Sequence, residues 1–133
     1  MPRELGEFFG ILIIVFYALT VLNYILKFLN KKFRFTSSKN ETVAKVSKFL
    51  MKLIVRNHPI FGFIAIGLVL IHFAIQALTI EISITGIIAA AIMLTQILLG
   101  FYGKKYKPKK KGWLYVHRGI AILLVVAIII HIA

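Results

Sequence analysis

The chain contains no cysteine and only four acidic residues among its 133. The lack of cysteine excludes disulfides, thiolate nucleophiles, iron–sulfur clusters and covalently attached c-type haem. Any metal chemistry therefore has to rest on histidine, methionine or carboxylates. The acidic residues are Glu4, Glu7, Glu41 and Glu81, and we expect none of them inside a membrane span.

Apolar sequence is what the chain has in excess, because 60% of its residues are hydrophobic and its mean hydropathy is +0.92. Four apolar runs stand out, each near the ~20 residues that a helix needs to cross the ~30 Å hydrocarbon core. They cover about 8–29, 58–79, 83–102 and 113–132. Since none of them alternates with a period of two, they favour helices over a β-barrel. We expect one all-α domain over residues 1–133, an integral membrane four-helix bundle that leaves no length for a soluble catalytic domain.

The net charge of +13 is distributed as a membrane protein requires, which argues against nucleic acid as a partner. Bases gather between spans one and two and again between spans three and four. They are Lys31, Lys32, Arg34, Lys39, Lys45, Lys48, Lys52 and Arg56 in the first loop, and Lys104, Lys105, Lys107, Lys109, Lys110 and Lys111 in the second. The positive-inside bias makes both loops cytoplasmic and puts both termini and the turn at 80–82 outside, in a prokaryotic plasma membrane. Anionic lipid headgroups are the default partner of these bases, and a docking surface for an acidic electron carrier is the alternative.

The two basic loops differ in their expected structure. Residues 41–57, "ETVAKVSKFLMKLIVRN", alternate apolar and basic positions at helical spacing, which predicts an amphipathic helix lying in the membrane interface. We expect it to stop at the "NHP" of 57–59, because a residue before proline is biased away from helix. In the second loop, "GKKYKPKKKG", we expect Gly103, Pro108 and Gly112 to break helical structure.

The chain has four histidines, and all of them fall in spans two and four. His58 and His72 are 14 residues apart, and so are His117 and His131. Fourteen residues of helix end about 40° short of four full turns, so both histidines of one span point to nearly the same face. They are also separated by a rise of about 21 Å, which is too far for one metal ion. Each histidine therefore needs its partner on another helix.

Spans two and four are separated by one further span, so we expect them to run parallel from the inside outward. His58 and His117 then lie at similar depth near the cytoplasmic face. His72 and His131 lie at similar depth nearer the outside. Each pair offers two opposed neutral imidazoles, and haem, a flat macrocycle with two open axial positions, fits between such a pair.

Two other interpretations stay open, namely hydrogen-bonded packing histidines and a histidine-lined pathway for protons or metal ions. A zinc or copper transporter would need ligands within a turn or two together with carboxylates, which the spans do not provide.

Room for a macrocycle is expected from span three, where Gly86 and Gly100 are again 14 residues apart. Glycine at these two levels would let a ring approach the helix backbone, although ordinary helix packing is an equal interpretation. Gly6 and Gly10 in span one have no partner at that interval. Arg118, directly after His117, could pair with a haem propionate or reach to the headgroups.

Histidines 14 apart on the second and fourth of four helices resemble the haem-bearing core of respiratory cytochrome b. The layout is also similar to the membrane domain of ferric reductases and NADPH oxidases, as are the strings "HPIFG" and "HRG" that begin at His58 and His117. The resemblance implies two non-covalent haem b groups with axial ligation by His58 with His117. It implies the same for His72 with His131. The flavin and nicotinamide domain of the oxidoreductases is missing from this sequence, and so are the later helices of respiratory cytochrome b.

Together these features lead us to expect a di-haem b-type cytochrome that carries electrons across the membrane. Its expected partners are a cytoplasmic electron donor or quinone, an external acceptor and, possibly through dimerisation, a second copy. The alternatives are a haem-bearing anchor subunit of a larger redox complex and a haem-free, histidine-lined transporter or channel.

Overall fold

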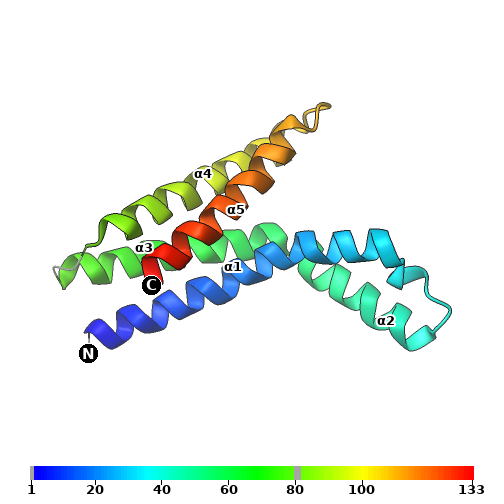
Figure 1. Ribbon diagram of the computed structural model, residues 1–133, viewed down its shortest axis with the longest axis horizontal. Coiled ribbons are helices and arrows are strands. Elements are labelled where there is room, and N and C mark those ends of the chain that lie inside the picture. Colours follow the sequence, from blue (N-terminus) through cyan, green and yellow to red (C-terminus); the bar gives the residue numbers. More distant parts are fainter. Residues whose placement is uncertain (1, 80–81) are drawn as a thin grey trace. The chain divides into compact units, whose positions relative to one another are not determined.

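In the computed structural model, every regular element of the described residues 2–79 and 82–133 is helical. The four long helices are α1 (Pro2–Phe33), α3 (His58–Leu78), α4 (Ile84–Tyr106) and α5 (Gly112–Ile132) (Figure 1). Three short elements, η1 (Phe35–Ser37), α2 (Glu41–Leu50) and the π-helical η2 (Met51–Val55), lie between α1 and α3 in the sequence. All four long helices are long and apolar enough to cross a membrane. The predicted all-α membrane fold class is therefore confirmed.

Helix α1 is longer than the predicted span of 8–29. It has 32 residues, which at 1.5 Å per residue makes it about 48 Å long, well beyond the ~30 Å hydrocarbon core. Its last turn carries Lys31 and Lys32, whose charges suit the headgroup region. Helix formation continues beyond the apolar run because lysine is a good helix former. Of the predicted turn at 80–82, residues 80 and 81 lie outside the described residues.

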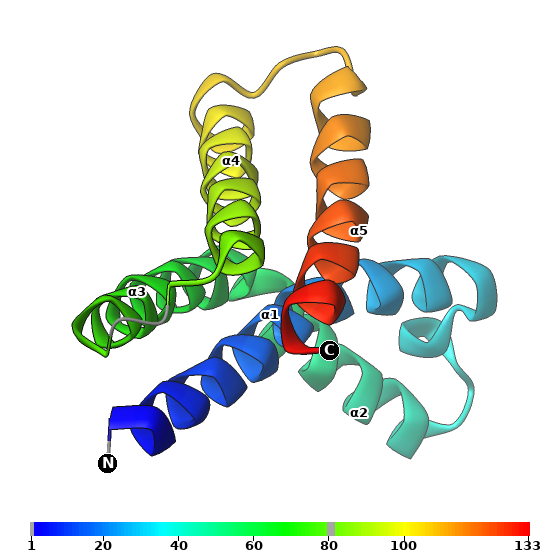
Figure 2. The ribbon, with the colours of Figure 1, turned by 60° about the vertical axis from the view of Figure 1, so that its left-hand side comes forward.

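The chain divides into two units, which are described separately. The first holds the start of α1, up to Gly10, together with the chain from Ile66 onward, and the second holds Ile11–Ala65. In the first unit, α4 and α5 form an antiparallel hairpin, in which the two helices lie side by side (Figure 2).

The ends of α4 follow local capping rules. Ser83 precedes the helix, and its side chain accepts a hydrogen bond of 3.1 Å from the backbone N–H of Gly86, as an N-cap serine does. At the other end Lys107 adopts a left-handed conformation with φ 43°, and its N–H donates to the carbonyl of Gly103 at 3.1 Å. Pro108 then prevents the helix from continuing.

Gly103 does not break helical structure, so that expectation was wrong. It lies inside α4, and a Cβ added to it would fall within the ring of Trp113 from α5. The missing side chain lets the indole pack directly on the α4 backbone, next to the loop that joins the two helices. Gly103 is therefore needed for close helix contact, whereas the chain turns only after Tyr106.

The second unit contains the loop between α1 and α2. The side chain of Asn30 accepts hydrogen bonds from the backbone N–H and the hydroxyl of Thr36, both at 3.1 Å, which ties η1 to the end of α1. Asn40 caps α2, since its side chain accepts from the N–H of Thr42 at 3.0 Å. A caps-and-turns segment of this kind sets the direction in which α2 leaves α1.

Helix α2 confirms the predicted amphipathic helix between spans one and two. Val46 and Phe49 expose apolar side chains, while Lys45 and Lys48 lie on the other side of the helix. The chain continues helically through η2 and makes its turn at Asn57, within the predicted "NHP" stop. The π-helical geometry of η2 has no signature in the sequence.

Most of the large apolar side chains on the long helices are exposed, as Leu78 at 85% and Ile122 at 68% illustrate. In water such exposure is costly, at about 25 cal/mol per Å² of apolar surface. Contact with lipid removes this cost. The burial pattern therefore agrees with helices that face hydrocarbon.

Candidate functional site

His72 is fixed to the first turns of α1 within the first unit. Its Nδ1 lies 2.9 Å from the backbone oxygen of Gly6, and its Cε1 lies 3.6 Å from where a Cβ on Gly10 would stand. A carbonyl oxygen only accepts hydrogen bonds, so the Nδ1–H of His72 is the donor. In the neutral ring the lone pair then resides on Nε2, the nitrogen that can bind a metal.

His131 is fixed to the start of α4 by two hydroxyl groups. Its Nδ1 lies 3.0 Å from the Oγ1 of Thr85 and 3.2 Å from the Oγ of Ser83. The ring also packs closely on Gly86, because a Cβ there would stand only 2.9 Å from His131 Cε1. Thr85, Ser83 and Gly86 thus hold the imidazole against the backbone through its Nδ1 and Cε1 edge.

The structure brings His72 and His131 together. Their ring centroids are 6.4 Å apart, and the ring planes are nearly perpendicular, at 86°. Each ring is held through Nδ1 by a partner on a different helix. Among the described residues no three His, Cys, Asp or Glu side chains gather into a metal-binding group. The outer histidines therefore offer a two-nitrogen site rather than a closed cage.

His117 lies in the α4–α5 hairpin in a different arrangement. Its Nε2 is 3.4 Å from the side-chain Nε2 of Gln96 on α4. Its Cε1 lies 3.2 Å from where a Cβ on Gly100 would stand, and its ring centroid is 6.3 Å from that of Trp113. Gln96, proposed from the sequence as a residue that bonds to another helix, makes its helix contact with this histidine.

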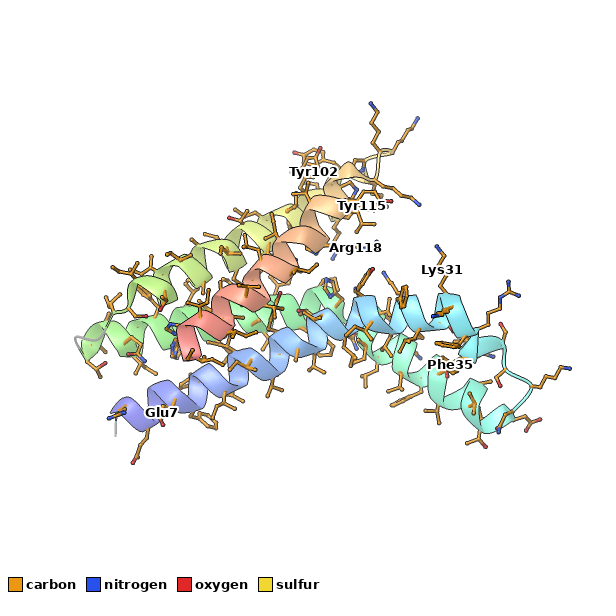
Figure 3. The ribbon with its side chains drawn as sticks, in the orientation of Figure 1. Glu7, Lys31, Phe35, Tyr102, Tyr115 and Arg118 are labelled. Carbon is orange, nitrogen blue, oxygen red and sulfur yellow. The ribbon has the colours of Figure 1, made fainter. Side chains whose placement is uncertain are left out.

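Arg118 follows His117 in α5, near the end of the hairpin that the lysine-rich loop closes. Tyr102 and Tyr115 lie toward the same end (Figure 3). Tyr102 packs on Tyr106 with a centroid distance of 5.2 Å. This gathering of aromatic and basic side chains matches the composition of a membrane interface.

His58 is the first residue of α3 and belongs to the second unit, whereas His117 belongs to the first. Its position at the start of a span agrees with the depth expected from the sequence. The pairing of His58 with His117 stays a prediction.

Sequence reasoning missed three contacts that position the histidines. The glycines at the 14-residue interval lie under imidazole rings, with Gly86 at His131 and Gly100 at His117. Gly10, which had no partner at that interval, takes the same position at His72. The antiparallel order of neighbouring helices was the signal, because glycine and histidine approach each other as one number rises and the other falls. Their role in admitting a macrocycle stays a prediction.

No family model, no curated protein and no solved structure matches this chain.

Proposed function

We propose that the protein is a di-haem b-type cytochrome that carries electrons across the membrane through two stacked bis-histidine haems. The approach of His72 to His131 carries this proposal. The outer haem would be held by these two residues and the inner haem by His58 and His117. Bound haem iron supplies one-electron redox chemistry, whose potential depends on axial ligands and burial.

The separation of the outer histidines supports a shared iron. A metal–imidazole bond is ~2 Å long, and the ring centre lies ~1 Å further on. Two imidazoles on opposite sides of one metal therefore have centroids about 6 Å apart. The observed 6.4 Å agrees with this value. With only two protein nitrogens at the site, a macrocycle that brings its own four nitrogens completes the coordination.

The hydrogen bonds of the outer pair support the same assignment. Metal-binding histidines generally donate their second ring N–H to a carbonyl, carboxylate or water, which fixes the tautomer and makes the other nitrogen a better ligand. His72 has this arrangement with Gly6 at 2.9 Å. His131 has the hydroxyl of Thr85 at 3.0 Å in the corresponding place. The chain's contribution is thus to hold both rings in place before a metal binds.

The surroundings of the inner level suit an anionic group facing the cytoplasm. Arg118 and the lysines of the α4–α5 loop would orient haem propionates there, with the basic loops inside and both termini outside. An electron donor or quinone on the cytoplasmic side and an acceptor outside complete the proposed path. Apolar helices around both levels exclude water from the two sites.

The haem content of purified protein tests the proposal, by the pyridine haemochrome assay on wild type and on single histidine variants. We expect His72→Ala and His131→Ala each to remove one haem of two. Ile71→Ala is the matched control, because Ile71 is the exposed neighbour of His72 on α3 and its loss should leave both haems bound. Unchanged haem content in His72→Ala would rule out the outer pair as ligands.

A further inference from the structure

Gln96 is a buried polar residue within a membrane-spanning helix. Only 9% of its surface is exposed, and it lies well inside α4, which qualifies as a span from Ile84 to Tyr106. An amide in such surroundings is costly unless it is hydrogen-bonded. Its contact is with the Nε2 of His117, at 3.4 Å from the amide nitrogen. A polar side chain has thus been placed against the very atom that would bind a metal.

This contact engages His117 Nε2 in either orientation of the amide. If the amide nitrogen faces the ring, it donates to the Nε2 lone pair, and that lone pair is occupied. If the amide is turned over so that its oxygen faces the ring, Nε2 must carry the hydrogen and has no lone pair to offer. In both cases Nε2 cannot bind a metal until the Gln96 side chain moves.

The outer level differs in this respect. His72 uses Nδ1, not Nε2, for its hydrogen bond to Gly6. His131 likewise uses Nδ1 for its bond to Thr85. Both outer rings therefore hold their hydrogen bonds on the nitrogen opposite to the metal-binding one. The two levels are not equivalent in the protein without haem.

We propose that Gln96 covers the metal-binding nitrogen of His117 and controls haem uptake at the inner site. This inference rests on the proposed function. It assigns Gln96 the role of a positioning residue that haem binding displaces, and it makes the inner site the weaker of the two.

The contact is strong enough to matter and weak enough to be broken. At 3.4 Å it is longer than the usual 2.7–3.2 Å. The second polar atom of the amide, Oε1, is buried and has no hydrogen-bond partner among the described residues, so the amide is only partly satisfied in this position. Removing one neutral hydrogen bond of this kind corresponds to about a two- to tenfold change in an equilibrium constant. We expect an effect of that size.

The test is a spectrophotometric titration of the haem-free protein with ferric haem in the His72→Ala background, which leaves the inner pair as the site to be filled. Gln96→Leu should tighten binding about two- to tenfold relative to the background protein, because one hydrogen bond no longer competes. Gln96→Met, which keeps the length and flexibility of the side chain, should do the same. Thr95→Val is the matched control, since the Thr95 hydroxyl bonds only to the backbone of Ala91 at 2.9 Å on the exposed side of α4.

Equal or weaker haem binding in both Gln96 variants would overturn the inference, while leaving the proposed function intact. The proposed function fails in a different way, if the wild-type protein takes up no haem at all. Nitrogen chemical shifts of His117 in haem-free protein give a second readout. They should change in Gln96→Leu and stay as in wild type in Thr95→Val, and an unchanged His117 signal in Gln96→Leu would also contradict the inference.

Discussion

Replacing Gly86 by alanine probes the contact on which the outer site depends. A Cβ at this position would stand 2.9 Å from His131 Cε1 and equally close to the Oγ of Ser83. Carbon atoms in ordinary contact are about 3.5–4.0 Å apart. The imidazole and the capping hydroxyl must therefore each give way by roughly half an ångström or more, and the hydroxyl is also the N-cap of α4.

Two opposing free energies decide the size of the effect. Overpacking in a well-packed contact costs about 1–3 kcal/mol, whereas alanine favours a helix over glycine by up to about 1 kcal/mol. We expect a net loss of up to about 2 kcal/mol for Gly86→Ala. Gly119→Ala on α5, where a Cβ meets nothing within 4 Å, should only gain. Gly100→Ala, with 3.2 Å to His117 Cε1, should lie between them.

The assay is reversible unfolding in mixed detergent micelles, followed by circular dichroism, for the three alanine variants and wild type. The stability order should be Gly119→Ala, then Gly100→Ala, then Gly86→Ala. Haem content should fall in the same order. If Gly86→Ala proved as stable as Gly119→Ala and kept its haem, the close packing of His131 on α4 would be refuted.

Three further predictions concern other contacts. Asn40→Ala removes the cap of α2 and should destabilise that helix by about 1 kcal/mol, seen as faster amide hydrogen exchange in α2, whereas unchanged exchange would count against the cap. Thr85→Val removes the shorter hydrogen bond to His131 and makes this ligand less basic; in a redox titration the outer haem potential should rise while Thr85→Ser stays near wild type, and equal potentials in the two variants would contradict this. Exchanging the lysines of 109–111 for glutamine should weaken anionic lipid binding by about 1 kcal/mol per charge, measured as co-purified anionic lipid, and an unchanged lipid content would exclude this loop as the binding surface.

Hydropathy was sufficient to predict the membrane helices, because each apolar run is bounded by charge or by breakers. The boundaries of α3, α4 and α5 fall within a few residues of the predicted spans. Helix α1 exceeded its predicted span since helix formation does not stop where hydrocarbon does. Gly103 was misread because composition alone cannot distinguish a glycine that ends a helix from one that admits a neighbouring ring, here that of Trp113.

The histidine pattern was readable from intervals along the chain, but its supporting contacts were not. The spacing of His117 and His131 says which residues share a helix face, and nothing about the atoms opposite them. The hydroxyl of Thr85 and the amide of Gln96 meet these rings only because α4 packs against α5 in one particular register. Such a register depends on side-chain packing across the hairpin, with Trp113 on Gly103 as one anchor.

The ratio of haem to protein, determined on protein purified after expression with adequate haem and accompanied by reduced and oxidised spectra, tests the central claim most directly. The account predicts two haem b groups per chain with the spectra of a six-coordinate, bis-histidine cytochrome. A colourless, folded protein would contradict it.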